Sequence, residues 1–436
     1  MIRLISLILM LLYSLAHSKT SSDFDNWLNQ GMAKHTIPGL SIAVFSNYQL
    51  VWAKGYGYAD VANKKLVTPS VLFQAGSISK PITAMAAIKA VQDGKLTLDG
   101  DINQNLQSWK IPQNDFTKKS PITLRRLLSH SGGFNVSGFI GYKKGSKLPT
   151  LVEILDGKSP ANSKPIQVTT KPGQKFSYSG GGYIVVQQAL IDVYHSTFTQ
   201  LMQDSILAPL NMTSSSFQQP LPKTVKNFAL PYYENYQLVP DAPYIYLEKA
   251  AAGLWTTPTD LGKALISIQK SLAGDKQQIL TKSSAQLMTV RPESHAPNLQ
   301  MGLGFIVKLN KYGKPAKEGT YFGHAGQNIG YRNLLIADIK QGNSIVIMTN
   351  MTPSDIKKSG AFKFIDENLK ELLICSNGNN FEILKTDKDK NDNYKNFRIN
   401  SRLVVFLQNI TSKEQAITRL KGHHNYVVIC HFNFSL

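Results

Sequence analysis

A serine and a lysine three residues apart carry the clearest chemical signal in the chain. Ser77 and Lys80 follow a turn-like Ala-Gly pair and precede an apolar segment. Residues three apart on a helix share a face, so a helix starting at Ser77 places the hydroxyl beside the amine. A serine becomes a good nucleophile when a neighbouring base takes its proton, and a lysine of lowered pKa can be that base. The same spacing is also common at a solvated helix start, so the context decides.

The residues around this pair predict where the helix begins and ends. Pro81 is tolerated in a first turn, because the first N–H groups of a helix have no intrahelical partner. Gly94 lies just past the last apolar residues and is a typical stop signal. We therefore expect a helix that begins at Ser77 and ends before Gly94.

Two further residues can take part in such chemistry. Tyr178 lies in a glycine-rich turn ahead of an apolar helix, and His324 ends a predicted strand. A neighbouring cation would lower the pKa of the phenol and let it carry a proton. Gly326 would let another backbone or a substrate approach the strand closely. Each residue alone is more often structural, but their order after the Ser-Lys pair favours a catalytic group.

Helix starts are also marked inside the middle of the chain. Thr123 precedes a short apolar-periodic segment, and Thr257 is followed directly by Pro258. Threonine is a favoured N-cap residue, and proline is favoured at the first helical position. We expect one helix to begin after each threonine, and an apolar helix over residues 184–194.

Strands are predicted at both ends of the chain and helices between them. An early hairpin and a late group of strands bracket the helical middle, residues 96–287, and terminal helices are expected over 21–35 and 354–373. The predicted strands are 39–45, 50–57, 302–309, 320–324, 331–338 and 344–350. This pattern predicts an α+β fold, with one antiparallel sheet built from both chain ends and flanked by helices. A mostly helical second lobe would leave the site in the cleft between the lobes.

The first residues are typical of a secretory signal peptide. An early Arg3 precedes an apolar run that is too short to span a membrane, and small residues flank a cleavage point before Lys19. We expect residues 1–18 to be removed, with a retained anchor as the alternative, and we expect no integral membrane segment afterwards. The protein is therefore predicted to be secreted or periplasmic. Residues 19–375 would form the hydrolase-like domain, and residues 376–436 a linker and a C-terminal segment without an assigned role.

The composition limits the partners. The 436-residue chain has a formal net charge of +20, which would attract it to anionic envelopes or polyanions. Its lysines are scattered and no nucleic-acid motif is present, so we expect no nucleic-acid partner. The two cysteines, Cys375 and Cys430, would be permitted to pair in an oxidising compartment. No histidine or cysteine spacing fits a zinc site, so neither a metal nor a cofactor is expected. The oligomeric state is left open.

Five motifs in order resemble those of the serine β-lactamase and penicillin-binding-protein superfamily. The likeness is greatest to the branch of class C β-lactamases, class VIII-type esterases and D-Ala-D-Ala carboxypeptidases, and it covers about Phe24 to Leu373. The motifs are Ser77-Ile78-Ser79-Lys80, Leu127-Leu128-Ser129-His130-Ser131-Gly132-Gly133, Tyr178-Ser179-Gly180, Ala252-Gly253-Leu254-Trp255 and His324-Ala325-Gly326. The resemblance implies the β-lactamase/transpeptidase fold, which is the fold predicted from strand placement.

The resemblance also implies roles for the matching residues. Ser77 would be the acylated nucleophile, and Lys80 would accept its proton or tune Tyr178. Tyr178 would act as general base and acid, and His324 would hold the third-motif position beside the cleft. The backbone N–H groups of Ser77 and Gln327 would form the oxyanion hole. Such donors typically contribute about 3 kcal/mol of transition-state stabilisation.

Two departures from the class C pattern bear on the substrate. Gly180 stands where those enzymes have an asparagine that contacts the acylamido group of the substrate. His324-Ala325-Gly326 replaces Lys-Thr-Gly, so a permanent cation becomes a mostly neutral imidazole and a hydroxyl is lost. Arg332 would supply charge if it faced the cleft, although a strand arginine is more often solvated. With Gly180 and Gly326 at the substrate, we expect esters or amides that lack an essential carboxylate.

Three functions are therefore weighed. The favoured one is a secreted serine hydrolase that forms an acyl-enzyme on a small ester, amide or peptidoglycan-like substrate. The second is a true β-lactamase or D-Ala-D-Ala carboxypeptidase. The third is a non-catalytic envelope-binding protein on the same scaffold, which the intact Ser77, Lys80 and Tyr178 disfavour.

Overall fold

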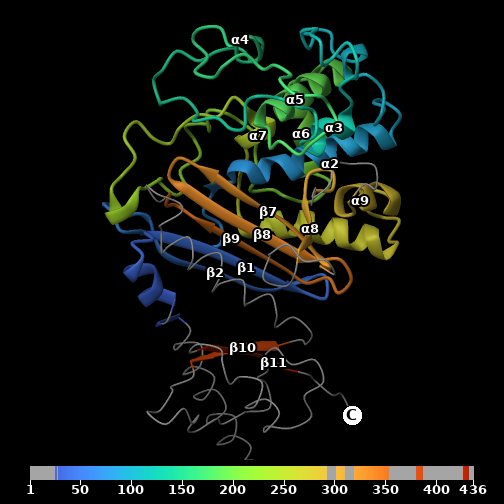
Figure 1. The fold of residues 1–436 in the computed structure, drawn as a ribbon. Helices are drawn as coiled ribbons and strands as arrows, with labels where there is room; N and C mark the ends of the chain where they lie inside the picture. Colours follow the sequence, from blue (N-terminus) through green and yellow to red (C-terminus); the bar gives the residue numbers. More distant parts are fainter. Residues whose placement is uncertain are drawn as a thin grey trace, which may run out of the picture.

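A seven-stranded antiparallel sheet built from both ends of the chain organises the computed structural model. The structure describes residues 25–26, 28–291, 301–309 and 319–352, together with the backbone of 380–385 and 426–431. The strand order is β3-β2-β1-β9-β8-β7-β6, with the early β1 beside the late β9 (Figure 1). The strands are β1 (Gly39–Ser46), β2 (Gln49–Asp60), β3 (Lys65–Leu66), β6 (Ile306–Leu309), β7 (Tyr321–Asn328), β8 (Tyr331–Asp338) and β9 (Ser344–Thr349). The predicted α+β fold is confirmed.

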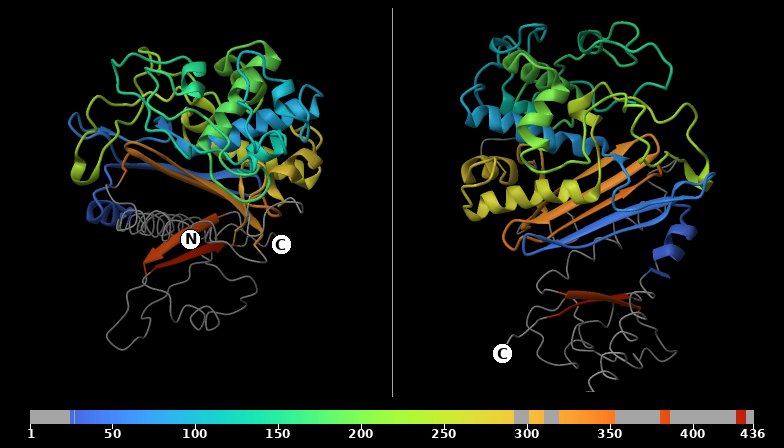
Figure 2. Two further views of the ribbon diagram at one scale, coloured as in Figure 1. Left: turned by 45° about the horizontal axis from the view of Figure 1, so that its top comes forward. Right: turned by 180° about the vertical axis from the view of Figure 1, so that it is seen from behind.

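The two faces of this sheet bury different cores. Side chains alternate between the faces of a strand, so Leu334 and Ile336 point to one face while Leu335 points to the other. The first face packs against the N-terminal helix through Leu28 and Met32. The second face packs against α8 (Pro258–Ala273) and shares one apolar core with the helical lobe (Figure 2). Sheet and lobe are therefore held together by a continuous core.

The helical lobe lies above the second face of the sheet (Figure 1). Its longest helices are α2 (Ser79–Gln92) and α5 (Gly180–Tyr194), which are buried along most of their length. The shorter helices are α3 (Leu124–Leu128), α4 (Leu151–Asp156), α6 (Phe198–Met202), α7 (Lys249–Ala252) and α9 (Lys282–Thr289). Among the residues described, no helix combines the length and the apolar character that crossing a bilayer requires.

Both predicted threonine caps are confirmed. The Thr123 hydroxyl accepts a hydrogen bond from the Arg126 N–H at 3.2 Å, and the Thr257 hydroxyl accepts from the Asp260 N–H at 3.3 Å. Pro258 is the first residue of α8. The helix expected over residues 184–194 begins four residues earlier, at Gly180, because the Ser179 hydroxyl caps it through the Gly182 N–H at 3.0 Å.

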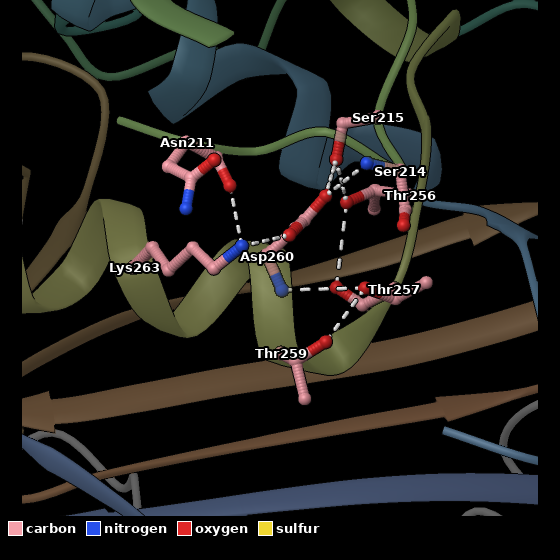
Figure 3. A network of polar contacts seen from close by, with 8 residues as sticks. All are labelled: Asn211, Ser214, Ser215, Thr256, Thr257, Thr259, Asp260 and Lys263. Carbon is pink, nitrogen blue, oxygen red and sulfur yellow. Dashed lines mark hydrogen bonds and ion pairs between the residues drawn. The ribbon is translucent and has the colours of Figure 1, made fainter. Parts of the chain in front are cut away.

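A buried polar network anchors the start of α8 (Figure 3). The Asp260 carboxylate, only 2% exposed, accepts from the Ser214 N–H and the Ser215 hydroxyl at 2.9 Å each and pairs with Lys263 at 2.7 Å. A buried carboxylate is tolerated when its oxygens are satisfied in this way. The Ser215 hydroxyl also contacts that of Thr256 at 2.7 Å. The network thereby fixes the short strand β5 (Trp255–Thr256), which pairs with β4 (Phe73–Gln74) just before Ser77.

Two local predictions are corrected. Ser77 lies in a 3₁₀ turn, η1 (Gly76–Ile78), and α2 begins only at Ser79, because the backbone here closes i to i+3 hydrogen bonds, with the Ile78 N–H on the Ala75 carbonyl at 3.3 Å and the Ser79 N–H on the Gly76 carbonyl. His324 lies inside β7 rather than at its end, because β7 pairs with β8 along its whole length.

Other predictions lie outside the described residues. These are the signal peptide, the helix over 354–373 and the side chains of the cysteine pair. The C-terminal segment shows one antiparallel pair of strands, β10 (Asn380–Lys385) and β11 (Tyr426–His431).

Candidate active site

Ser77 and Lys80 are in direct contact at the start of α2. The Lys80 Nζ lies 3.0 Å from the Ser77 Oγ and donates to the Ala251 carbonyl at 2.9 Å. The lysine side chain is only 2% exposed, and this burial lowers its pKa to about 7. A large share of the amine is therefore unprotonated near neutral pH and can accept the serine proton.

Tyr178 is the third member of the cluster, and its ring lies 5.0 Å from the Lys80 Nζ. Desolvation raises the pKa of the phenol to about 12, and a hydrogen bond with Ser77 opposes this shift. The expectation that the lysine would lower the pKa of the phenol is wrong, because the cost of desolvating the phenolate is the larger effect. Near neutral pH the phenol is therefore a proton donor.

His324 joins the cluster from β7. Its ring centre lies 6.3 Å from that of Tyr178, and the side chain is 4% exposed. Burial and the charge of Lys80 lower the pKa of the imidazole to about 3. The Nδ1–H donates to the Ala325 carbonyl at 2.6 Å, which suits a neutral ring. The third-motif position thus holds an uncharged side chain.

Two glycines let the η1 turn lie directly against β7. A Cβ added to Gly76 would lie 2.5 Å from the Gln327 backbone nitrogen, and one added to Gly326 would lie 1.9 Å from the Ala75 carbonyl oxygen. Any side chain at either position would push the two backbones apart. The close approach brings the η1 turn, which contains Ser77, against the Gln327 backbone.

The Ala-Gly-Leu-Trp motif connects the nucleophile segment to the rest of the site through its backbone. The Leu254 carbonyl accepts from the Ala75 N–H at 2.8 Å, and the Leu254 N–H donates to the Ser79 hydroxyl at 3.0 Å. The Asn328 amide of β7 donates to the Ala252 carbonyl at 3.0 Å. Together with the hydrogen bond from Lys80 to the Ala251 carbonyl, these contacts fix α2, α7 and β7 relative to one another. The role of Ala251 is absent from the sequence signal because it acts through a main-chain oxygen.

Gly180 opens α5 beside a loop that fills the neighbouring space. A Cβ at this position would lie 3.0 Å from the Phe139 ring and 3.1 Å from the Ser137 carbonyl oxygen. An asparagine side chain here would therefore crowd the edge of the Phe139 ring, which would have to shift to admit it. The sequence indicated the missing amide but not the ring that replaces it.

Arg332 does not join the cluster. It pairs with Gln327 across β7 and β8, and the alternation of the sheet places it on the same face as Leu334. His324, which pairs with Leu335, points to the opposite face. Arg332 therefore does not take the position of the missing third-motif lysine, although its charge still reaches His324 and helps to lower the pKa of the imidazole.

His130 is a buried neighbour of Tyr178 to which the sequence analysis assigned no role. Its ring centre lies 4.2 Å from that of Tyr178, and the side chain is 1% exposed. Its place in the Leu-Leu-Ser-His-Ser-Gly-Gly motif was the feature of the sequence that could have pointed to it as a site residue.

Comparisons with known proteins agree with this geometry. A model of the beta-lactamase family matches residues 24–367. Protein flp of Staphylococcus aureus (strain N315) is 24% identical over 355 residues, which are 78% of this chain and 65% of that protein. A teichoic acid D-alanine hydrolase of Staphylococcus aureus is 27% identical over 234 residues, which are 53% of this chain and 54% of that protein. The chain thus spans less than two thirds of the length of these relatives.

Solved structures with the same fold include two of particular interest. D-amino acid amidase from Ochrobactrum anthropi SV3, complexed with L-phenylalanine amide, superposes with a TM-score of 0.64 at 22% identity and covers 80% of this chain and 97% of its own. FmtA from Staphylococcus aureus gives a TM-score of 0.60 at 21% identity and covers 81% of this chain and 90% of its own. At such identities the likeness shows the fold.

Proposed function

Because the chain belongs to the beta-lactamase family, we propose that it is a serine hydrolase that forms an acyl-enzyme on Ser77, acting on carboxylic esters or peptide-like amides. One observation carries the proposal. The Lys80 amine lies 3.0 Å from the Ser77 hydroxyl in a setting that lowers its pKa to about 7. A nucleophile and a base in direct contact are what acyl transfer requires.

The residues divide the proton transfers between them. The neutral Lys80 amine takes the proton of Ser77 as the Oγ attacks the substrate carbonyl carbon, and the backbone N–H groups of Ser77 and Gln327 receive the oxyanion. The Tyr178 phenol then gives its proton to the leaving group and is reprotonated by the Lys80 ammonium. In deacylation, water takes the place of the leaving group and the proton transfers run in reverse.

The site favours an acyl group that brings no essential carboxylate. His324 is neutral, Arg332 lies on the other face of the sheet, and Phe139 occupies the space beside Gly180. One similar protein is named teichoic acid D-alanine hydrolase and another D-amino acid amidase. These names support D-aminoacyl esters or amides as substrates. The net charge of +20 supports a substrate carried on an anionic envelope polymer, and so a secreted or periplasmic location.

The second candidate is a β-lactamase or D-Ala-D-Ala carboxypeptidase. Membership of the family favours it, whereas the uncharged third motif disfavours it, since both substrates carry a carboxylate. A chromogenic cephalosporin is the substrate that separates the two candidates.

Covalent labelling tests the acyl-enzyme. A serine-directed phosphonate should add one adduct to the purified protein, located by peptide mass spectrometry on Ser77. Ser77→Ala should abolish the adduct, and Ser70→Ala, which changes an exposed serine seven residues earlier, should leave it intact. A protein that remains unlabelled, although its circular dichroism spectrum shows that it is folded, would contradict the proposal and favour a non-catalytic binding role.

A further inference from the structure

His130 lies directly beside the site, just past the end of α3. It adopts a φ of +56° as the left-handed residue that ends the helix: its N–H donates to the Leu127 carbonyl at 3.3 Å, and the Ser131 N–H donates to the Arg126 carbonyl at 2.9 Å. This pair of hydrogen bonds is a common way for a helix to end, so the conformation places His130 but does not by itself mark a functional site. The contacts of the residue decide its role.

The contacts of His130 lie on both sides of Tyr178. The His130 carbonyl accepts from the Ser177 N–H at 2.8 Å, and the His130 Nδ1 accepts from the Ser179 N–H at 3.0 Å. The imidazole itself lies against the phenol ring, with centres 4.2 Å apart and planes inclined by 32°. One residue therefore holds both chain neighbours of Tyr178, Ser177 and Ser179, and packs against its ring.

The hydrogen bond to Ser179 also fixes the state of the imidazole. An Nδ1 that accepts carries no proton, so the neutral ring carries its proton on Nε2. The groups that face the ring are Lys80, His324, Tyr178 and Tyr183, with the Phe176 ring at its edge. Burial lowers the pKa of His130 well below its ordinary value, and the neighbouring Lys80 acts in the same direction. The ring is thus a neutral acceptor near neutral pH.

We propose that His130 is a positioning residue that holds the Tyr178 phenol at Ser77 for proton transfer to the leaving group. This inference rests on the proposed function, because it assigns His130 a part in the same reaction. His130 reaches the reacting atoms only through Tyr178, so its effect should depend on the Tyr178 hydroxyl. A histidine that merely packs the core would act independently of that hydroxyl.

A double-mutant cycle between the two residues separates these cases. His130→Ala and Tyr178→Phe are made singly and together, and kcat for a p-nitrophenyl ester is measured on protein counted by phosphonate labelling of Ser77. We expect His130→Ala to lower kcat by about 10²-fold with little change in KM, as a misplaced catalytic group does. In the Tyr178→Phe background the same change should cost less than about 3-fold. If kcat of the double variant falls by the product of the two single-variant losses, the residues act independently and the proposal is overturned.

Two further variants test the hydrogen bond and the strain. His130→Asn keeps a short acceptor for Ser179 and tolerates the left-handed backbone, so it should be more active than His130→Ala. The matched control is His195→Ala, which changes an exposed histidine with a φ of +50° directly after α5 and should keep the wild-type kcat. An asparagine variant as slow as the alanine variant, or a control that falls equally, would contradict the assignment. If His130→Ala does not fold, the cycle is run with His130→Asn.

The same experiment distinguishes failure of the inference from failure of the proposed function. If Ser77→Ala leaves ester hydrolysis unchanged, the proposed function is wrong and the cycle has no reaction to report on. If Ser77→Ala abolishes hydrolysis and the cycle is additive, the function stands and the positioning role of His130 is wrong.

Discussion

The pKa values of Lys80 and Tyr178 are moved apart by their surroundings, to about 7 and about 12. When the pKa values of two neighbouring groups are moved apart in this way, the group of lower pKa is suited to act as the base and the group of higher pKa as the acid. In free solution both groups titrate near pH 10, so each would hold its proton near neutrality. Burial leaves a large share of the amine unprotonated, and so available as a base near neutral pH, while it keeps the phenol protonated. This order of pKa values supports Lys80 as the group that takes the serine proton in the proposed reaction.

The assignment predicts the pH dependence of the reaction. For ester hydrolysis, kcat/KM should rise with pH as Lys80 loses its proton, with a midpoint near 7, and should stay level beyond pH 9 because Tyr178 remains protonated. His324, with a pKa of about 3, should cause no further change in rate between pH 5 and 10. The check is a rate profile from pH 5 to 10 corrected for spontaneous hydrolysis. A midpoint near pH 10 would contradict the role of Lys80 as base.

Gly180 gives a second prediction at this scale. Gly180→Asn should lower kcat/KM by about tenfold or more, because the new side chain meets the Phe139 ring and displaces the segment that carries Tyr178. Adding Phe139→Ala should restore activity by removing the obstacle. The measurement is kcat/KM for the ester in both variants and in Phe139→Ala alone. A fully active Gly180→Asn protein would show that the space beside Gly180 is open.

At the scale of elements, the site depends on how closely the η1 turn approaches β7. Gly326→Ala should lower kcat by about 10²-fold while the protein stays folded, because its Cβ would lie 1.9 Å from the Ala75 carbonyl oxygen and shift Gln327 away from Ser77. Gly138→Ala is the matched control, since a Cβ there meets nothing within 4 Å. Steady-state kinetics and circular dichroism give the two readouts. Equal activity in both variants would remove the argument for an oxyanion hole at this contact.

The helix α7 presents a carboxyl group whose burial affects stability. Glu248 directly precedes α7, is fully buried, and has a pKa raised to about 7 by burial. Its folded pKa lies above its unfolded value, so the folded state binds more protons between about pH 4.5 and 7. Stability from this group is complete at low pH and is lost as the pH rises through 7.

Glu248→Gln should remove this dependence. Between pH 5 and pH 8 the wild-type free energy of unfolding should fall by about 3 kcal/mol more than that of the variant, on the linkage of one such pKa shift. Urea unfolding at the two pH values measures the difference, with the exposed Asp115→Asn as control. Parallel changes in wild type and Glu248→Gln would contradict a buried, neutral Glu248.

The pattern of elements shows what the sequence can and cannot predict. Strand β8 (Tyr331–Asp338) was predicted with its bounds, because its apolar run is bordered by clear turn signals. The prediction ended strand β7 (Tyr321–Asn328) four residues too early, because the alanine, glycine, glutamine and asparagine of its second half give no alternating apolar pattern. Its length comes from pairing with β8, which is a tertiary effect.

The same reasoning explains the outcome for the site. Ser77, Lys80, Tyr178 and His324 were found through side-chain types and order, and the structure brings them together. The contribution of Ala251 uses a main-chain carbonyl, and that of Phe139 depends on the path of a loop, so neither has a sequence signature. The pKa order of Lys80 and Tyr178 also followed from burial rather than from spacing.

On the scale of the whole molecule, the sheet places the third motif beside the first. Strand β7, near the end of the chain, reaches the η1 turn because β1 and β9 join the two chain ends within one sheet. The helical lobe adds Tyr178 from the loop before α5, and one core spans both parts. The site is therefore a product of the complete fold, and the proposed substrate preference rests on an uncharged third motif within a strongly basic protein.

The most direct test of this account is a comparison of rates on the purified protein. A short-chain p-nitrophenyl ester, a D-alanyl ester and a chromogenic cephalosporin are assayed side by side, each with Ser77→Ala. The account predicts ester turnover that Ser77→Ala abolishes and little turnover of the cephalosporin. Fast, Ser77-dependent cephalosporin turnover would contradict it, because an uncharged third motif with Arg332 on the far face of the sheet would then still recognise a carboxylate.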